Sequence, residues 1–235
     1  MLFRARFYMS DSGRPRCGAI CFFHTPKIDH DAVPLPGIIP TASLDGGGTS
    51  LLAINERVRL MSCQDMVIRP ERAEDQNDIV HLHEEAFGPG RFAKTAYRLR
   101  EGVQPVRSLS LVALDQGGKG PLVRKERLVG SIRFTAVTIE GSKGALLLGP
   151  LAVYVDYSGH RCGLRLMKQG LALARRQKFQ MVLLVGDLAY YQKVGFAQVP
   201  PGQIEMPGPV DLNRLLALEL QAGSLLDYKG RISVL

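Results

Sequence analysis

ALLLGPLAV, residues 145–153, opens the stretch that decides the fold, and it is an apolar run broken midway by Gly149 and Pro150. Such a run is typical of a buried strand that bulges or separates from its neighbour at the break. SGHRCG, residues 158–163, then turns the chain into an amphipathic helix, and MVLLV, residues 181–185, is the returning strand. The sequence therefore predicts a strand, a crossover helix and a second strand of an α/β fold.

The predicted helix has one apolar and one basic face. The apolar positions are Leu164, Met167, Leu171 and Ala174, and the basic positions are Arg165, Lys168, Arg175 and Arg176. The first backbone N–H groups of a helix lack internal partners and lie at the positive end of its dipole, so phosphate binds there readily. A crossover that binds no ligand is the alternative interpretation of this turn.

Three short motifs in register extend this interpretation. They are LGPLAV at residues 148–153, LVGD at residues 184–187 and YYQKVGF at residues 190–196. Over residues 66–220, their order and spacing resemble the GCN5-related N-acetyltransferase (GNAT) family, in particular a small bacterial subgroup that carries LGPLAV. The resemblance implies an α/β (α+β) fold with a mixed, mostly antiparallel central sheet flanked by helices. It also implies an acyltransferase that uses acetyl-CoA as co-substrate and needs no metal.

The acetyl-CoA loop of this family has Gln or Arg, two further residues, Gly, one residue, and then Gly or Ala. In this chain the same frame gives Ser158, Arg161 and Gly163. The cofactor-binding residues that the resemblance implies are Leu151, Val153, Ser158, Gly159, His160, Arg161, Cys162, Gly163 and Leu164. Because Ser158 and Arg161 depart from the pattern, a catalytically impaired acyl-CoA-binding or regulatory protein is the alternative to an active transferase.

The implied chemistry is direct attack of a primary amine on the thioester of acetyl-CoA. The attacked carbonyl develops negative charge, and a backbone N–H freed where the strand breaks, that of Leu151 or Val153, is the predicted oxyanion donor. The departing sulfur needs a proton, which a Tyr four residues before the Gly of a Gly-Phe pair commonly supplies in this family. That residue is Tyr191, whose phenol is protonated at neutral pH. Tyr190 is expected to pack beside the cofactor.

No general base stands out in the sequence. The candidate carboxylates are Glu84, Glu85, Glu140 and Asp187. Each fits a solvated or capping role better than that of a base, and Asp187 is expected to cap the short helix that leads to Tyr191. The acceptor amine is not identified, and its pocket is expected around FGPGRF, residues 87–92, near the first two helices.

The remaining pattern favours one acetyltransferase-like domain over residues 66–235. Strands are predicted at 67–69, 108–115 and 128–140, helices at 73–87 and 92–100, a turn at 204–211, and a last strand or short helix at 215–220. Residues 1–65 are rich in Pro and Gly without periodicity. We expect them to be a disordered extension or a start placed too far upstream of Met66, with a small appended element or a targeting peptide as further alternatives.

Composition narrows the class of protein and its partners. The 235 residues are 46% hydrophobic and carry a formal net charge of +8, which suits an anionic cofactor. The basic residues are scattered without interleaved aromatic residues, which argues against a nucleic-acid partner. No apolar run is long enough for a membrane span, so no membrane partner is expected. The acceptor amine is the expected second partner, and a homodimer is left open.

The cysteines indicate the compartment. Four cysteines without regular spacing favour reduced thiols and a cytoplasmic protein. Cys17, Cys21, His24 and His30 are zinc-ligand types, but their spacing lacks the separated layout of common structural sites. The sequence therefore does not predict a zinc site.

Overall fold

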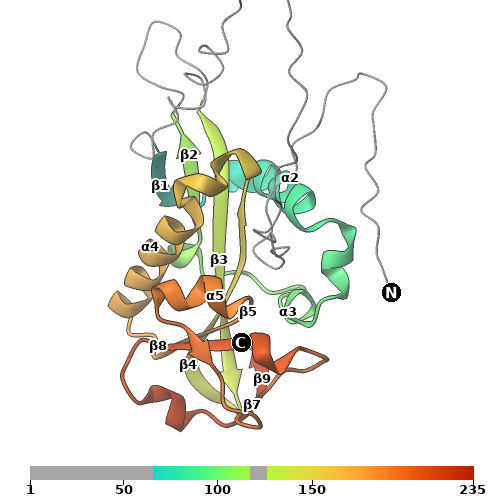
Figure 1. Ribbon diagram of the computed structural model, residues 1–235, viewed down its shortest axis with the longest axis vertical. Helices are drawn as coiled ribbons and strands as arrows, with labels where there is room; N and C mark the ends of the chain where they lie inside the picture. Colours follow the sequence, from blue (N-terminus) through green and yellow to red (C-terminus); the bar gives the residue numbers. More distant parts are fainter. Residues whose placement is uncertain (1–65, 117–125) are drawn as a thin grey trace, which may run out of the picture.

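The main sheet has the strand order β1-β2-β3-β4-β5-β8-β6 in the computed structural model, which describes residues 66–116 and 126–235 (Figure 1). The strands are β1 (Met66–Pro70), β2 (Leu111–Asp115), β3 (Arg127–Ile139), β4 (Ser142–Val153), β5 (Met181–Val185), β6 (Ala197–Gln198), β7 (Ile204–Glu205), β8 (Leu215–Glu219) and β9 (Gly230–Val234). The α-helices are α2 (Gln76–Phe87), α3 (Thr95–Arg98), α4 (Cys162–Arg176) and α5 (Leu188–Tyr191). The 3-10 helices are η2 (Ala73–Asp75), η3 (Pro89–Ala93), η4 (Arg107–Leu109), η5 (Val155–His160), η6 (Gln192–Val194), η7 (Leu212–Arg214) and η8 (Ser224–Asp227).

β4 is the strand on which the site depends. Its residues 145–147 pair in parallel with β5, and beyond them its only paired neighbour among the described strands is β3. The register with β3 shifts between Ile132 and Phe134, because Gly149 and Pro150 together stand opposite one residue of β3. Gly149 has a φ of +119°, a conformation that favours glycine. β4 and β5 therefore diverge at this bulge and leave an open edge on β4.

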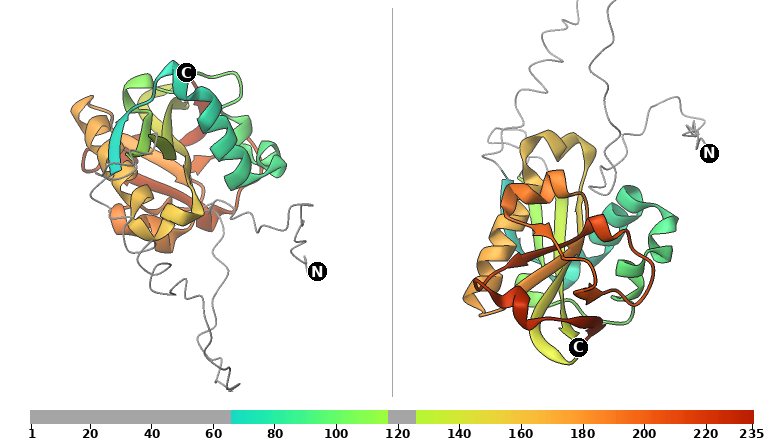
Figure 2. Two further views of the ribbon diagram at one scale, coloured as in Figure 1. Left: turned by 90° about the horizontal axis from the view of Figure 1, so that it is seen from above. Right: turned by 60° about the horizontal axis from the view of Figure 1, so that its bottom comes forward.

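The helices cover opposite faces of the sheet (Figures 1 and 2). α4 packs on one face, where Gly170 lies so close to Phe134 of β3 that a β-carbon would come within 2.6 Å of the ring. α2 packs on the other face, where Nε2 of His83 and Oγ of Ser131 lie 2.9 Å apart. Neighbouring strand residues point to opposite faces, so β3 supplies side chains to both layers. α3 lies on the same side as α2.

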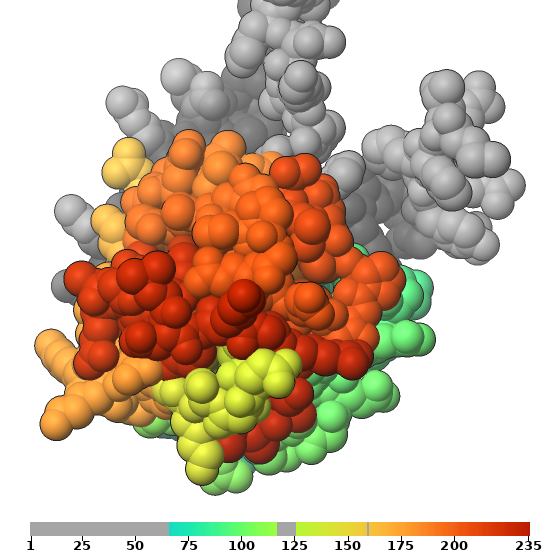
Figure 3. Space-filling model, turned by 90° about the horizontal axis from the view of Figure 1, so that it is seen from below, coloured from blue at the N-terminus to red at the C-terminus, as the bar shows by residue number. Residues whose placement is uncertain are grey.

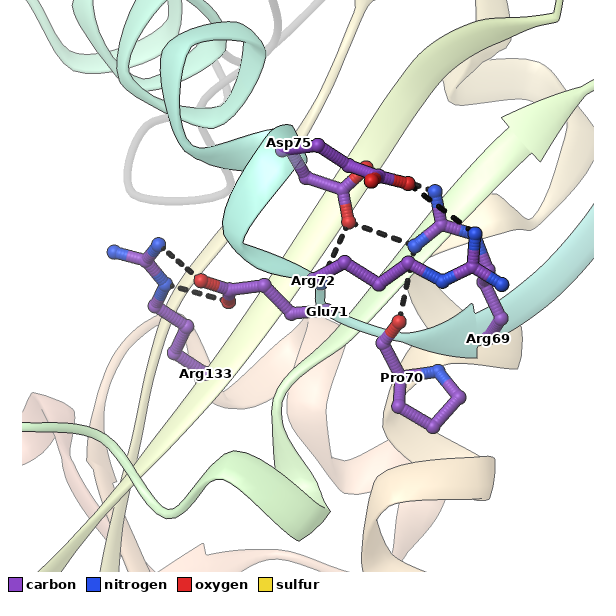
Figure 4. A network of polar contacts seen from close by, with 7 residues as sticks. Arg69, Pro70, Glu71, Arg72, Asp75 and Arg133 are labelled. Atoms are coloured by element: carbon purple, nitrogen blue, oxygen red, sulfur yellow. Dashed lines mark hydrogen bonds and ion pairs between the residues drawn. The ribbon is translucent and has the colours of Figure 1, made fainter.

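A pair of ionic contacts fixes the chain where β1 leads into α2 (Figure 4). The Arg69 guanidinium donates from Nη1 and Nη2 to the two carboxylate oxygens of Asp75, at 2.7 and 2.8 Å. Arg133 of β3 donates from Nε and Nη2 to the carboxylate of Glu71, at 2.9 and 2.6 Å. Its Nη2 also donates to Oε1 of Gln76 at 2.8 Å. These two-pronged contacts tie the start of α2 to the sheet.

The C-terminal segments close the far end of the sheet. β9 pairs antiparallel with β3 over Val137, Thr138 and Ile139, and β7 pairs in parallel with β9. Together they cover a second cluster of buried side chains, which includes Tyr228 and Ile232. Figure 3 shows these segments in red beside the hairpin that joins β3 to β4, in yellow.

The fold class that the sequence predicted is confirmed, with corrections to individual elements. The returning strand is β5 with the predicted bounds, and residues 215–220 form a strand, β8. The predicted helix at 92–100 is wrong, because η3 and the four-residue α3 stand in its place. The predicted turn at 204–211 begins with strand β7, and β9 follows β8, so 215–220 is not the last element.

Some expectations concern residues outside those described. The predictions for residues 1–65 and the zinc hypothesis for Cys17, Cys21, His24 and His30 fall there. Within residues 66–116 and 126–235, no group of three or more His, Cys, Asp or Glu side chains could hold a metal ion. None of the helices over the same ranges has the length and apolarity that crossing a membrane requires.

Candidate active site

The open edge of β4 carries backbone donors. Successive residues of a strand direct their N–H groups to opposite sides. The N–H of Tyr154 donates to the carbonyl oxygen of Val129 in β3, at 3.0 Å. The N–H groups of Val153 and Leu151 therefore point away from β3, toward the side from which β5 has separated. The two residues proposed from the sequence as oxyanion donors thus share one edge.

The turn after β4 leads directly into α4. η5 ends at His160, and Arg161 takes a left-handed conformation, with φ 56° and ψ 22°, before α4 begins at Cys162. The N–H of Arg165 donates to the carbonyl oxygen of Arg161 at 3.0 Å, which closes the first turn of the helix. The N–H groups of the preceding helical residues, Cys162 to Leu164, lie outside this ladder and form an anion-binding geometry.

The residues of the predicted cofactor loop differ in exposure. Cys162 and Gly163 are buried, Ser158, His160 and Leu164 are half-buried, and Arg161 is exposed. Of the predicted apolar face of α4, Met167, Leu171 and Ala174 are buried as expected, and Leu166 and Gly170 are buried besides. Leu164 is partly buried and packs against the core from the same face. Arg161 therefore presents its positive charge to solvent.

α5 places two tyrosines beside these elements. Oδ1 of Asp187 accepts from the N–H of Ala189 at 2.9 Å, which confirms the predicted cap of α5. Tyr191 is 2% exposed and packs edge-to-face against Tyr190 and Phe196. Burial raises the pKa of Tyr190, and the nearby thiol of Cys162 adds to this. α5 thus lies against the start of α4.

Arg100 reaches the bulge of β4 from the opposite layer. Its Nη2 donates to the carbonyl oxygen of Leu148 at 3.1 Å and lies 2.9 Å from the place that a β-carbon on Gly149 would occupy. Burial lowers the pKa of Arg100 to about 10, against smaller opposing effects of Tyr97 and Tyr191. Arg100 was not predicted from the sequence, because no local pattern indicates a contact with a residue 48 positions away.

His83 is a second residue that the sequence did not reveal. It lies in α2 and lines the same cavity as Arg100, and its ring contacts the Ser131 hydroxyl of β3. Burial lowers the pKa of His83 to about 3, and the nearby Arg133, Arg91 and Arg100 contribute to the shift. The imidazole is therefore neutral at pH 7 and adds no charge to the site.

Two cavities meet at Tyr97 and Arg100. One of about 460 Å³ is lined by the ends of α2 and β5, by α3 and by residues 209–214. The other, of about 240 Å³, lies between the residues around α3 and strands β3 and β4, and reaches Gly149 and Pro150. The Thr95 hydroxyl donates to the carbonyl oxygen of Pro209 at 2.6 Å and joins two walls of the larger cavity.

None of the four candidate general bases lines either of these two cavities. Glu84 contacts Arg91 at 3.4 Å, and Glu85 lies 3.9 Å from His81 on the same helix. Oε1 of Glu140 accepts from the N–H of Arg231, and Asp187 caps α5. The acids that do line the cavities are Glu101 and Asp211.

Comparison with known proteins identifies the family. No family model matches the chain. The uncharacterized N-acetyltransferase YjhQ of Escherichia coli K12 is 33% identical over 125 residues, which are 52% of this chain and 64% of YjhQ. The GNAT family N-acetyltransferase YhbS of the same strain, itself uncharacterized, is 30% identical over 132 residues, which are 56% of this chain and 73% of YhbS. The chain belongs to the GNAT family of N-acetyltransferases.

The GNAT fold is also seen in a solved structure. The crystal structure of E. coli YhbS in complex with CoA superposes with a TM-score of 0.61 and 24% identity, over 73% of this chain and 90% of that one. The chain spans slightly less than two thirds of YjhQ, 64% of its length. Both relatives, YjhQ and YhbS, are named N-acetyltransferases.

Proposed function

We propose that this GNAT protein transfers an acetyl group from acetyl-CoA to a primary amine, by direct attack of the amine on the thioester. The observation that carries the proposal is the open edge of β4, which leads within ten residues into the N-terminus of α4. One chain segment thereby offers backbone donors for an acyl group and an anion site for a pyrophosphate. The CoA complex of the relative YhbS supports the same cofactor.

The predicted cofactor-binding residues support this role through their backbone N–H groups rather than through their side chains. The N–H groups of Cys162, Gly163 and Leu164 at the start of α4 are proposed to bind the pyrophosphate. Substitution leaves these donors in place, so the departures at Ser158 and Arg161 do not remove them. Val153 and Leu151 are proposed to bind the remainder of the cofactor along β4.

Catalysis is proposed to rest on two groups. The backbone N–H of Leu151 stabilises the negative charge that develops on the attacked carbonyl oxygen. The phenol of Tyr191 donates a proton to the departing thiolate of CoA. Tyr191 is suited to this role because its buried ring is held by Gly186 and Phe196, so its hydroxyl has a fixed position. The base that deprotonates the amine is not assigned.

A non-catalytic acyl-CoA-binding protein is the second candidate, and it is not favoured. A buried Tyr191 and a cavity at the bulge large enough for a small acceptor are features that acetyl transfer needs and cofactor binding alone does not. The cytoplasmic location and the homodimer stay predictions from the sequence.

The test uses the full 235-residue chain. We expect acetyl-CoA to bind with a micromolar Kd in a calorimetric titration, and a thiol reagent to detect CoA release when an amine acceptor is present. Tyr191→Phe should slow this release about 100-fold without changing the Kd for acetyl-CoA. Tyr190→Phe is the matched control, since it also loses one hydroxyl, and should keep its rate.

The outcomes separate the two candidates. Binding of acetyl-CoA without CoA release by any amine would support the non-catalytic protein. Absence of binding would contradict both. Equal rates for Tyr191→Phe and Tyr190→Phe would show that Tyr191 is not the proton donor.

A further inference from the structure

Arg100 is a cation without a carboxylate partner in the described parts of the chain. Its Nη2 donates to Leu148, and its guanidinium lies 5.8 Å from the centroid of the Tyr97 ring. Its Nε is buried, and no hydrogen-bond partner for it exists in residues 66–116 and 126–235. The ion pairs found in these ranges join other arginines to acids and leave Arg100 out. Arg100 is half-buried and its Nε is fully buried, so an anion bound beside it would stabilise this cation.

The cavity of about 240 Å³ beside Arg100 has a positive lining. Arg98 and Arg133 also line it, and Glu101 is its one acid among the described residues. Arg133 is already neutralised by Glu71, whereas Arg100 has no such neighbour. His83 contributes no charge, because the pKa of His83 lies well below neutrality. Arg98 is exposed to solvent, so Arg100 is the less solvated of the two remaining cations and the one that an anion inside the cavity would bind.

We propose that the acceptor is an amine that also carries a carboxylate, and that the Arg100 guanidinium binds this carboxylate. The proposal rests on the proposed acetyltransferase function. The planar guanidinium offers donors in a fork that matches the two oxygens of a carboxylate. Because Arg100 also contacts Leu148 at the bulge of β4, a carboxylate bound to it leaves the amine of the same molecule near Leu151. Small amino acids have this combination of groups.

A purely structural role is the competing explanation. Arg100 satisfies the carbonyl of Leu148 and could serve only to hold the bulge. The two roles differ in what they predict for matched substrates. A structural Arg100 affects all amines alike, whereas a carboxylate-binding Arg100 distinguishes an acid from its uncharged analogue.

The experiment compares amino acids with their carboxamides, using glycine, β-alanine and the common L-amino acids as the probes. The carboxamide has nearly the same shape without the charge, and its amine is more easily deprotonated, so any bias works against the proposal. For the best acceptor we expect kcat/KM of the acid to exceed that of the amide about 30-fold, as for a hydrogen bond to a charged group. Arg100→Gln should bring this ratio close to one, and Arg100→Lys should restore part of it.

Arg98→Gln is the matched control, because Arg98 is exposed and lines the same cavity. It should keep the preference for the acid. An equal loss of acid and amide turnover in Arg100→Gln would overturn the proposal, and so would better turnover of amides than of acids. A preference for O-phosphoethanolamine over every amino acid would also overturn it, in favour of a phosphate.

A binding measurement keeps this test independent of catalysis. The same amino acids and amides are added to the full chain without acetyl-CoA, and the shift in melting temperature is recorded. Stabilisation by an acid but not by its amide, lost in Arg100→Gln, supports the carboxylate site even if acetyl-CoA does not bind and the proposed function fails. If acetyl-CoA binds but no acid stabilises the protein or is acetylated, the carboxylate site is overturned and the acetyltransferase function is not.

Discussion

Arg161 holds a conformation that suits glycine. Its φ of 56° and ψ of 22° lie in the left-handed region, which costs a residue with a side chain about 1 kcal/mol relative to glycine. Arg161→Gly should therefore raise the free energy of unfolding by about 1 kcal/mol in a urea titration. It should also tighten acetyl-CoA binding in calorimetry, since the backbone could then approach a pyrophosphate more closely.

Lys178 provides the control for this change. It has a φ of 61° just after α4, where the N–H of Phe179 donates to Ala174 and its own N–H to Arg175, the pattern of a helix end that prefers glycine. Lys178→Gly should give a similar gain in stability with no change in the Kd for acetyl-CoA. Weaker binding by Arg161→Gly would mean that the guanidinium, rather than the turn, binds the phosphate.

Gly186 leaves the space that the Tyr191 ring occupies. A β-carbon at Gly186 would overlap Cε2 of Tyr191 and lie 2.8 Å from its Cδ2. Gly186→Ala should therefore displace the ring, lower the free energy of unfolding by about 1–3 kcal/mol and reduce acetyl transfer. Gly90→Ala is the control, since no atom lies within 4 Å of the added carbon. Normal activity of Gly186→Ala would contradict a precise placement of Tyr191.

The stability of the fold depends on pH because His83, in helix α2, is buried. The pKa of His83 is about 3 in the folded protein, because burial disfavours the charged ring. In the unfolded chain it returns to about 6.5. Between these values the unfolded state binds one more proton, so stability falls as the pH falls below about 6.5, by about 1.4 kcal/mol per unit. Urea titrations at pH 7.5 and pH 5.5 measure this loss.

His83→Gln should reduce this dependence, because glutamine does not titrate. His81→Gln is the matched control, since His81 is exposed on the same helix. The same loss of stability in all three proteins would show that His83 does not cause it.

The elements that sequence patterns predict are those whose signal is local. β5 was predicted with its bounds because five consecutive apolar residues mark a buried strand. α3 was not, because the extended Lys94 separates it from η3, and because the Thr95 hydroxyl at its start is bound to Pro209, a contact that no local pattern reveals. The backbone donors of β4 and the Tyr191 position followed from motifs. Arg100 did not, because its place depends on a cavity that only the packed layers create.

The C-terminal strand β9 pairs with β3 of the main sheet and with β7. β9 was not predicted, since its short segment has one buried residue, Ile232, and gains its order from pairing with β3. Ile232→Ala should lower the free energy of unfolding by about 2–4 kcal/mol. Ser233→Ala, an exposed change in the same strand, should leave it within about 0.5 kcal/mol. A small effect of Ile232→Ala in thermal or urea unfolding would mean that β9 adds little to the fold.

The conformation of Gly149 limits which residues evolution can change at this site. Its φ of +119° disfavours any side chain there, whatever residue stands at position 100. The guanidinium of Arg100 lies at the far end of a flexible side chain, so that residue carries no such restriction. A lineage can therefore replace Arg100 while it keeps Gly149. Changes of acceptor in this branch should fall in the helical layer and leave the bulge of β4 unchanged.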